Sequence, residues 1–434
     1  MDATITTELG VFPSDWRVDR FDSVFDVQQG RQVSKGNRVG ENQRPFLRTK
    51  NVFWNRLDLA DLDEMHFSEA DESRLAMKPD DLLICEGGDI GRTAIWGGVL
   101  SRCYYQNHLH RARIRNPKTA DAQFVLFFLW YAFEFGHLYF GRGNVTTIPN
   151  LSQSKLRELP VAIPPLAEQR KIAGVLGLVQ RALEQQERLI ALTTELKKAL
   201  LHKLFTQGLR GEPQKQTEIG PVPESWEQRP LEQTGDVVYG IQAAVASNLK
   251  PVGTKILTNK NITLDGRITL EKINYFVLKT PRHHATVLRK GDLLFNWRSG
   301  SKEHVGKTAY FDLDGEFTHS SFILRIRPHD EVSGRYLFYY LNFLRESAYF
   351  VKTQTFAVNA KFNKSAINRL PTFLPKEEER KEIATALDAV GAKLKTLQAK
   401  HAALGALFRT LLHQFMTAQL RVNNLDIDTS EVEA

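Results

Sequence analysis

The segment ELGVFPSDW (residues 8–16) returns, with changes, as EIGPVPESW (residues 218–226), an offset of 210 residues. Further matching blocks follow both copies in the same order, at offsets between 210 and 215 residues. Three of these blocks are Lys50-Asn51-Val52 with Lys260-Asn261-Ile262, Gly91-Arg92-Thr93-Ala94 with Gly306-Lys307-Thr308-Ala309, and Leu200-Leu201-His202 with Leu411-Leu412-His413. Chance does not keep a series of blocks in order over half a chain, so the sequence is an internal duplication.

Each half begins with a globular part of ordinary domain size and ends in a long helix. Alternating segments such as 111–115 and 322–327 predict strands, and aromatic stretches near 122–140 and 334–350 predict one buried helix in each half. We therefore predict an α+β fold, in which two mixed α/β domains are joined by two long antiparallel coiled-coil helices with a pseudo-two-fold internal repeat. The predicted boundaries are 1–160 and 211–371 for the domains, 161–210 and 372–421 for the helices, and 422–434 for an acidic tail.

A heptad seam of apolar residues runs along both predicted helices. The series that starts at Ile172 is apolar at seven of ten positions, and the series 211 residues later at nine of ten. A seam sustained over more than four heptads predicts a coiled coil, and two such helices in one chain predict that they pair with each other. The predicted pairing residues are Ile172, Leu176, Val179, Leu183, Ile190, Leu200 and Leu204 in the first helix, and Ile383, Leu387, Val390, Leu394, Leu397, Leu404, Phe408 and Leu411 in the second.

The charge balance of the chain is basic. It has 58 Lys and Arg residues against 50 Asp and Glu, a net charge of +8, which favours a polyanionic partner. Cys85 and Cys103 form neither a disulfide framework nor a zinc motif, which fits a reducing compartment. The first ten residues lack the features of a signal peptide, and the apolar run 124–140 is too interrupted to span a membrane. We therefore expect a cytoplasmic protein without membrane contact.

No catalytic motif is complete. The segment 301–308 resembles a phosphate-binding loop but has serine where the first glycine is required. The prolines of segment 163–166 lack the amide and the aromatic residue of a DNA-methylation motif. The pair His108 and His110 has no Cys, Asp or Glu cluster at metal-ligand spacing nearby. The sequence therefore predicts no catalytic residue, no metal site and no cofactor in this chain.

Polar and basic loops that differ between the halves lie between the matching blocks. Arg and Lys side chains suit phosphates and guanine, and Asn and Gln suit adenine edges. Similar frames with unlike loops are typical of two domains that recognise different base sequences. The predicted DNA-binding residues are Arg31, Lys35, Arg38, Arg92, Gln106, Asn107, His108, Arg142 and Asn144 in the first half, and Gln242, Asn248, Lys250, Asn296, Arg298, Lys302, His319 and Gln354 in the second.

The chain resembles a known family along its whole length. The motif of residues 9–16, its copy at 219–226 and the helix start at 159–173 are similar to those of Type I restriction-modification specificity subunits. The second helix start departs from this pattern, because Glu379-Arg380 stands where the first half has Glu168-Gln169.

The resemblance implies a non-catalytic subunit that recognises bipartite double-stranded DNA through two target recognition domains separated by a helical spacer. It also implies assembly with two methyltransferase subunits and with restriction/translocase subunits. S-adenosylmethionine, ATP and magnesium would belong to those partners. An apolar row beside the pairing seam of the first helix would dock a methyltransferase subunit; it comprises Val175, Leu178, Ala182, Gln185, Leu189, Leu192, Leu196 and Ala199.

Two other functions remain open. One is a fragment of a single-chain restriction or methylation enzyme, which is disfavoured because the two repeats leave no room for a catalytic domain of ordinary size. The other is a coiled-coil scaffold with two heads that do not bind DNA. That alternative gives no reason for the basic loops rich in Asn and Gln.

Overall fold

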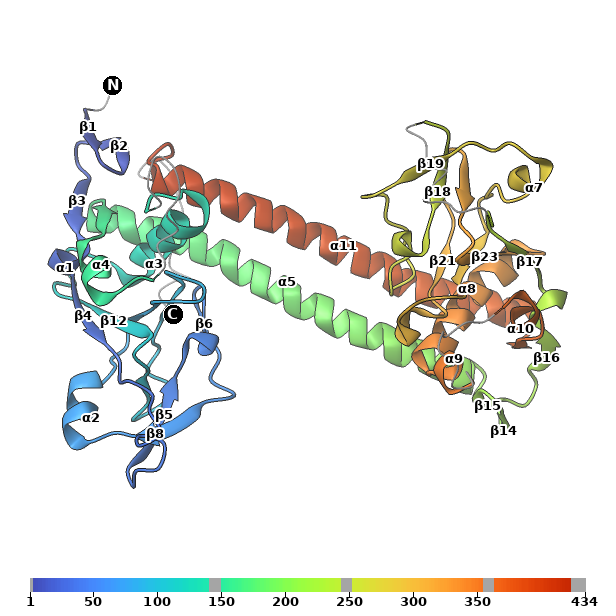
Figure 1. The fold of residues 1–434 in the computed structure, drawn as a ribbon, viewed down its shortest axis with the longest axis horizontal. Coiled ribbons are helices and arrows are strands. Elements are labelled where there is room, and N and C mark those ends of the chain that lie inside the picture. Colours follow the sequence, from blue (N-terminus) through green and yellow to red (C-terminus); the bar gives the residue numbers. More distant parts are fainter. Residues whose placement is uncertain (1–2, 140–149, 243–251, 354–362, 423–434) are drawn as a thin grey trace. The chain divides into compact units, whose positions relative to one another are not determined.

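The computed structural model describes residues 3–139, 150–242, 252–353 and 363–422. The chain divides into two compact units. Unit 1 comprises Met1–Glu187 with Ala399–Ala434, and unit 2 comprises Arg188–Gln398. Two long helices, α5 (Leu166–Gln207) and α11 (Glu377–Met416), each contribute one part to unit 1 and the other part to unit 2 (Figure 1). The predicted long helices are therefore present.

The main sheet has the same strand order in both units. It is antiparallel, with the order β10-β9-β12-β4 in unit 1 and β21-β20-β23-β17 in unit 2. These strands are β4 (Phe25–Gln29), β9 (Leu82–Cys85), β10 (Thr93–Ile95) and β12 (Leu109–Ile114), and β17 (Gly235–Tyr239), β20 (Leu293–Asn296), β21 (Thr308–Tyr310) and β23 (Ile323–Pro328). The predicted internal repeat of mixed α/β domains is confirmed strand by strand.

A second, three-stranded sheet also occurs in both units. Its middle strand pairs in parallel with one neighbour and antiparallel with the other. The strands are β5 (Gln43–Leu47), β8 (Asp63–His66) and β11 (Tyr104–Tyr105) in unit 1, and β18 (Thr254–Leu257), β19 (Asn274–Phe276) and β22 (Phe317–His319) in unit 2. A parallel pair requires a long connection, which the intervening segments supply.

The four residues of β9 are all fully buried, because its two faces pack in different cores. Leu82 and Ile84 belong to the core beneath helix α3 (Ala122–Trp130), whereas Leu83 and Cys85 belong to the core beneath the three-stranded sheet. Alternate side chains of a strand point to opposite faces, so a strand between two layers is apolar throughout.

The aromatic helix of each unit begins at an aspartate that caps it. Asp121 accepts a hydrogen bond from the Phe124 backbone N–H at 2.8 Å before α3, and Asp330 accepts one from the Ser333 N–H at 2.7 Å before α8 (Glu331–Glu346). A side-chain oxygen at this position satisfies an N–H that has no partner within the helix. Nearly every residue of α3 is buried, as the aromatic composition predicts.

The repeated opening motif forms a hairpin and a buried tryptophan. In unit 1 strand β1 (Thr4–Thr7) pairs with β2 (Gly10–Pro13), and in unit 2 β14 (Gln214–Thr217) pairs with β15 (Gly220–Pro223). The tryptophans that end the motif, Trp16 and Trp226, are both buried in the cores. The motif therefore anchors the start of each repeat.

Each long helix begins after a short strand that the sequence alone assigned to the helix or its border. β13 (Pro160–Ile163) pairs with β3 (Arg17–Arg20), and β24 (Pro371–Leu374) pairs with β16 (Glu227–Pro230). Prolines at 164, 165 and 375 separate strand from helix, since proline lacks the N–H that a helix interior requires. The helices consequently begin at Leu166 and Glu377, later than predicted.

The two long helices pack against each other in opposite directions within each unit. In unit 1, Ile172 near the start of α5 shares a core with Phe408 near the end of α11. In unit 2, Leu204 near the end of α5 shares a core with Ile383 near the start of α11. Every predicted pairing residue is buried or half-buried. The packing of the two helices within each unit is therefore antiparallel.

Candidate nucleic-acid interface

Three loops meet at one end of the main sheet in each unit, and we call them the loop cluster. In unit 1 they follow β4, follow β9 and precede β12; in unit 2 they follow β17, follow β20 and precede β23. A glycine allows two of them to cross closely. Arg31 bridges Gln106 in unit 1, and Ile241 bridges Ser320 in unit 2. The preceding glycines, Gly30 and Gly240, allow this crossing. A Cβ atom at either one would lie 2.2 Å from a carbonyl oxygen of the opposite segment. Only glycine permits so close a backbone approach, so the loop cluster has the same frame in both units.

The loop cluster of unit 1 is polar. The Gln29 side chain donates hydrogen bonds to Glu86 Oε2 at 3.1 Å and to the Asn107 carbonyl at 3.0 Å. His108 is exposed, and its Nδ1 lies 3.9 Å from the same Glu86 oxygen. Lys35 is also exposed on the loop that follows Gly30. These groups can donate to and accept from base edges and phosphates.

The loop cluster of unit 2 is largely aromatic. Tyr239 and Trp297 make an edge-to-face contact with ring centroids 5.5 Å apart. The Trp297 indole N–H donates to the Ser321 carbonyl at 2.7 Å. The Arg298 guanidinium lies 5.6 Å from the ring centroid of Phe322. Both Arg298 and Phe322 are exposed. The cluster therefore presents a cation over an aromatic ring.

The structure places six of the predicted DNA-binding residues where a ligand could reach them. The five exposed ones are Lys35, Arg38, His108, Gln242 and Arg298, and Asn107 is half-buried. They lie on the converging loops of their respective units. Another five predicted residues, Arg142, Asn144, Asn248, Lys250 and Gln354, lie outside the described residues, as does the side chain of Lys302.

Three predicted DNA-binding residues are buried and require correction. Gln106, Asn296 and His319 are exposed by 5%, 0% and 0%. Asn296 donates to the His304 carbonyl at 2.7 Å and closes the loop that follows β20. His319 bonds through Nδ1 to the Thr286 carbonyl at 3.1 Å, and burial lowers its pKa to about 4. These side chains support the loops from inside and cannot contact a base in this arrangement.

Two predicted arginines are occupied within unit 1. Arg31 pairs with Asp71, donates to Asn37 at 2.9 Å and lies over the ring of Phe67. Arg92 donates to the Thr49 carbonyl at 3.0 Å and pairs with Asp89 at 2.5 Å. In the sequence these residues look like ordinary loop cations, because Asp71 and Thr49, which they also contact, are distant along the chain. Their main role in the structure is to join loops to one another.

The sequence prediction missed the aromatic members of the unit 2 cluster. Tyr239 ends β17, Trp297 follows β20 and Phe322 precedes β23. Each resembles a core residue in the sequence, where aromatic side chains usually mark burial. A signal was nevertheless present, because all three positions align with polar residues of the first repeat: Gln29, Glu86 and His108.

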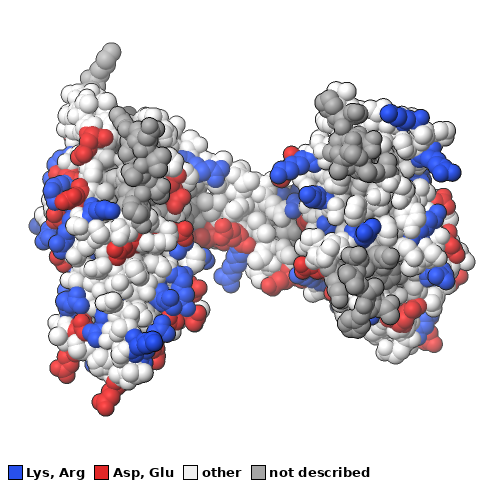
Figure 2. Space-filling view, viewed as in Figure 1, with Lys and Arg blue, Asp and Glu red and all other residues white. Residues whose placement is uncertain are grey.

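Basic and acidic side chains are interspersed over each unit on the face drawn in Figure 2. The net charge of +8 is thus not gathered into one patch on that face. The loop clusters therefore matter more than overall charge, which favours polyanions without selecting a sequence.

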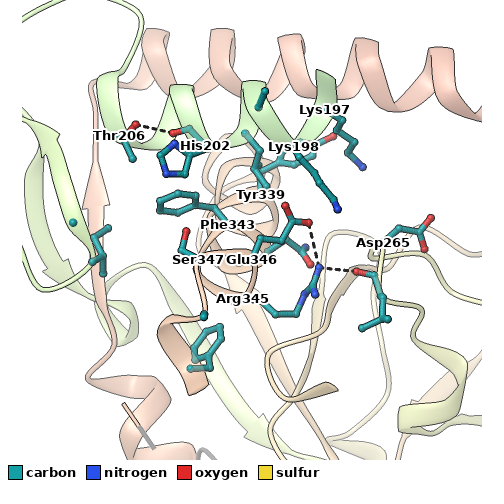
Figure 3. A pocket seen from close by; sticks show the side chains of 18 of the residues that line it. Lys197, Lys198, His202, Thr206, Asp265, Tyr339, Phe343, Arg345, Glu346 and Ser347 are labelled. Carbon is teal, nitrogen blue, oxygen red and sulfur yellow. Dashed lines mark hydrogen bonds and ion pairs between the residues drawn. The ribbon is translucent and has the colours of Figure 1, made fainter. Parts of the chain in front are cut away.

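Unit 2 also contains a cavity of about 1060 Å³ beside α5 and α8 (Figure 3). In unit 1 the corresponding place is filled by three packed aromatic rings. Trp54 lies parallel to Trp130 at 5.5 Å, and Phe408 packs against Trp130 at 5.1 Å. The second repeat has Leu264, Asn342 and Lys197 at these positions, and all three line the cavity.

The cavity is thus a consequence of smaller or polar residues in the second repeat. Its lining carries both signs of charge, with Lys197, Lys198 and Arg345 beside Asp265 and Glu346 (Figure 3). Arg345 is held by the Leu264 carbonyl at 2.9 Å and by Glu346 at 3.2 Å. This balance favours neither an anionic nor a cationic ligand.

Arg380, which departs from the family pattern at the second helix start, has an internal role. In the first repeat, Gln169 donates to the carbonyls of Thr119 and Pro164 and accepts from the Asp121 N–H. Its counterpart Arg380 donates to the Ser333 hydroxyl at 3.0 Å, in the first turn of α8. Both side chains tie the long helix to the start of the aromatic helix, so the difference lies inside the fold.

An apolar surface lies on the part of α5 that belongs to unit 2. Leu189, Leu192 and Leu196 are exposed by 48%, 53% and 57%. They follow a helical spacing of three and four residues and therefore share one face. The earlier members of the predicted row, Val175 and Leu178, are half-buried in unit 1. We call Leu189, Leu192 and Leu196 the leucine face.

The described residues contain no group of three or more His, Cys, Asp or Glu side chains that could hold a metal ion. Both cysteines are buried, and burial raises the pKa of Cys85 to about 11 and that of Cys103 to about 12. Such thiols are poor nucleophiles and poor metal ligands. Within the described ranges, no helix is long and apolar enough to cross a bilayer.

A family model for the Type I restriction modification DNA specificity domain matches residues 13–194 and again residues 223–405. Two specificity subunits of Methanocaldococcus jannaschii are similar to this chain. The putative type I restriction enzyme MjaX subunit is 24% identical over 229 residues, which cover 51% of this chain and 53% of that protein. The type I restriction enzyme MjaVIII subunit is 22% identical over 430 residues, which cover 95% of each chain.

Two solved structures share the fold. The S subunit of a Type I restriction-modification system from M. genitalium has a TM-score of 0.57 at 14% identity, covering 95% of this chain and 99% of that one. A chain from a structure of the assembly and conformational transition of a type I system has a TM-score of 0.59 at 18% identity, with coverage of 94% and 99%. At this identity the likeness concerns the fold.

Proposed function

Since the chain belongs to the family of Type I restriction-modification DNA specificity domains, we propose that its two units recognise the two halves of a bipartite double-stranded DNA target. The chain is the specificity subunit of a restriction-modification complex. The single observation that carries this proposal is the combination of identical strand order with unlike side chains at equivalent loop positions. Two frames that hold different contact groups suit two different base sequences.

In unit 1 the contact groups are hydrogen-bonding side chains. Lys35 and Arg38 neutralise phosphates or donate to guanine, while Asn107 and His108 face base edges. In unit 2, Gln242 and Arg298 take these roles. Bidentate contacts of this kind contribute roughly 1–3 kcal/mol of discrimination against a wrong base.

The experiment begins with the chain coexpressed with its methyltransferase subunit. Mapping methylated adenines in the host genome gives the bipartite target. Binding is then measured on duplexes that carry both halves, or in which one half is scrambled. Arg38→Ala should weaken recognition of one half only, and Arg298→Ala recognition of the other half only. Lys381→Ala, which removes an exposed cation from α11, is the matched control.

Three outcomes oppose the proposal. If both arginine variants affect the same half, the units do not recognise separate sequences. If purified chain with methyltransferase binds scrambled and intact duplexes equally, the heads do not recognise DNA sequence, as in a scaffold. If the rigorously purified chain turns over S-adenosylmethionine alone, it is a fused enzyme. We propose that the chain catalyses neither DNA methylation nor DNA cleavage. S-adenosylmethionine, ATP and magnesium would act in the partner subunits.

The leucine face supports docking of a methyltransferase subunit. Exposed leucines lose contact with water when a partner covers them, which contributes about 25 cal/mol per Å² of apolar area. Positions 393 and 400 in the equivalent row of α11 are exposed lysines, so the two helices offer unlike surfaces. Restriction/translocase subunits would join the complex that methyltransferase subunits form.

Substitution of the leucine face tests this docking. Leu192→Lys with Leu196→Lys should abolish copurification of the methyltransferase subunit, because two charges replace the apolar surface. Ala191→Lys places the same charge on another exposed face of α5 and should leave copurification unchanged. Circular dichroism checks that the helices persist. Equal copurification in both variants would remove the leucine face from the interface.

A further inference from the structure

Strand register gives the equivalent positions of the two loop clusters. In unit 1, Leu109 lies opposite Cys85 and His110 opposite Gln29. In unit 2, Ile323 lies opposite Asn296 and Leu324 opposite Tyr239. The loop residues next to these strand positions are therefore equivalent in the two units as well. Gln29 is equivalent to Tyr239, Glu86 to Trp297, and His108 to Phe322.

These three positions carry opposite chemistry in the two units. In unit 1 an amide donates a hydrogen bond to a carboxylate, and an imidazole lies 3.9 Å from that carboxylate. In unit 2 three aromatic rings replace them, and the backbone frame is unchanged because the glycine crossing is the same. Hydrogen-bonding groups and aromatic rings make different contacts with the edge of a base pair.

Phe322 is the exposed member of the aromatic set. Tyr239 and Trp297 are half-buried and hold each other, whereas 41% of Phe322 is exposed. Exposing a phenyl ring gives up part of the stabilisation that its burial would contribute. The neighbouring Ser321 carbonyl is fixed by the Trp297 indole, so the loop that presents the ring is held in place.

Arg298 lies against this ring and keeps its donors available. Within the described part of the chain, the Phe322 contact is the interaction that its guanidinium makes. A guanidinium over an aromatic face is attracted by the ring, and its N–H groups stay available in the guanidinium plane. Planar donors beside an apolar edge match two groups that adjoin in the major groove: guanine O6 and N7, and the thymine methyl.

We propose that Phe322 recognises a thymine methyl in the half-site of unit 2 and that Arg298, oriented by the same ring, contacts a neighbouring guanine. This assignment rests on the proposed function, since it requires that unit 2 bind double-stranded DNA. Unit 1 has His108 at the position of Phe322, so its half-site is selected there by a hydrogen bond. The two halves of the target thus differ in the kind of group that is recognised.

The test uses the full chain with its methyltransferase subunit and the target found by methylation mapping. Each thymine of the unit 2 half-site is replaced in turn by deoxyuridine, which pairs like thymine but lacks the methyl group. At one position the unsubstituted complex should lose affinity about fourfold, the change expected for one buried methyl-sized group. Phe322→Ala should bind thymine and deoxyuridine duplexes equally.

Two further variants sharpen the test. Phe322→His installs the residue of the first repeat and should also remove the preference for thymine. Arg298→Ala should lower affinity and relax the preference for guanine beside that thymine. His108→Ala, with deoxyuridine placed in the unit 1 half-site, is the matched control. It should leave the ratio of thymine to deoxyuridine affinity as it is in the unsubstituted complex.

The results that overturn the proposal are separate from failure of the proposed function. If Phe322→Ala keeps the preference for thymine, the methyl is recognised elsewhere. If Phe322→Ala weakens every duplex and deoxyuridine has no effect, the ring acts as a wedge between bases and not as a methyl contact. If the unsubstituted complex has no bipartite target at all, the proposed function fails before this question arises.

Discussion

Arg421, just beyond the end of α11, ties the C-terminal part of unit 1 to the start of α5, and its removal should destabilise the protein strongly. Its guanidinium donates to both oxygens of Glu168, at 2.6 and 2.8 Å, and to those of Asp15, at 3.2 and 2.7 Å. The Trp16 indole N–H also donates to Glu168, at 3.2 Å. These hydrogen bonds raise the pKa of Arg421, which therefore stays charged.

The magnitude follows from the burial of Glu168. Its side chain is only 1% exposed, so Arg421→Ala leaves a buried carboxylate with the Trp16 N–H but no countercharge. Breaking a buried ion pair in this way costs about 3–5 kcal/mol. The pair with Asp15, whose side chain is 48% exposed, adds little because solvent screens it. We expect a loss of about 3 kcal/mol in the free energy of unfolding.

The internal repeat provides the matched control. Arg210 stands 211 residues earlier, at the equivalent position, but its pair with Glu382 spans 3.4 Å between side chains that are 55% and 53% exposed. The equivalent of Glu168, Glu379, accepts instead from the Leu209 backbone N–H at 2.8 Å. Arg210→Ala should therefore cost less than about 1 kcal/mol, as exposed ion pairs usually do.

Urea denaturation of the purified chain, followed by tryptophan fluorescence, measures both variants, and hydrogen exchange locates the loss in unit 1. Adding Glu168→Gln to Arg421→Ala should recover part of the stability, because it removes the uncompensated charge. Equal, small losses in Arg421→Ala and Arg210→Ala would refute the reasoning. So would a double variant less stable than Arg421→Ala alone.

Three further predictions concern titration, packing and the independence of the units. Burial lowers the pKa of His319 to about 4, so below pH 6.5 the unfolded chain binds a proton at this histidine more readily than the folded chain. The free energy of unfolding should therefore fall by up to about 3 kcal/mol between pH 6.5 and 4. His319→Asn should reduce this pH dependence in urea titrations. Phe408→Ala removes a buried ring that packs against Trp130 and should cost about 3–5 kcal/mol by denaturation, whereas Lys197→Ala at the equivalent cavity position should cost less than about 1 kcal/mol. Exchanging residues 20–155 for those of a relative should change one half of the methylated sequence; a change in both halves would contradict independent recognition.

The sequence by itself determined the architecture. Two copies of one pattern required two similar units, and the heptad series from Ile172 and from Ile383 required two long helices that pair. Such features are local or periodic: each short segment carries the signal, and the duplication repeats it. For the same reason the buried aromatic helix was recognisable before its contacts were known, although α3 ends at Trp130, earlier than the predicted stretch.

Only the tertiary structure decided which polar residues face a ligand. Asn296 and His319 end strands β20 and β22 beside polar segments, yet they are buried and bond to the carbonyls of His304 and Thr286. Phe322 is an aromatic residue of the kind usually found in a core, yet it is exposed beside Arg298. Burial depends on which distant segments pack over a side chain, and no pattern within a short window contains that information. The frame of the two loop clusters was therefore predictable from the repeat, and their chemistry was not.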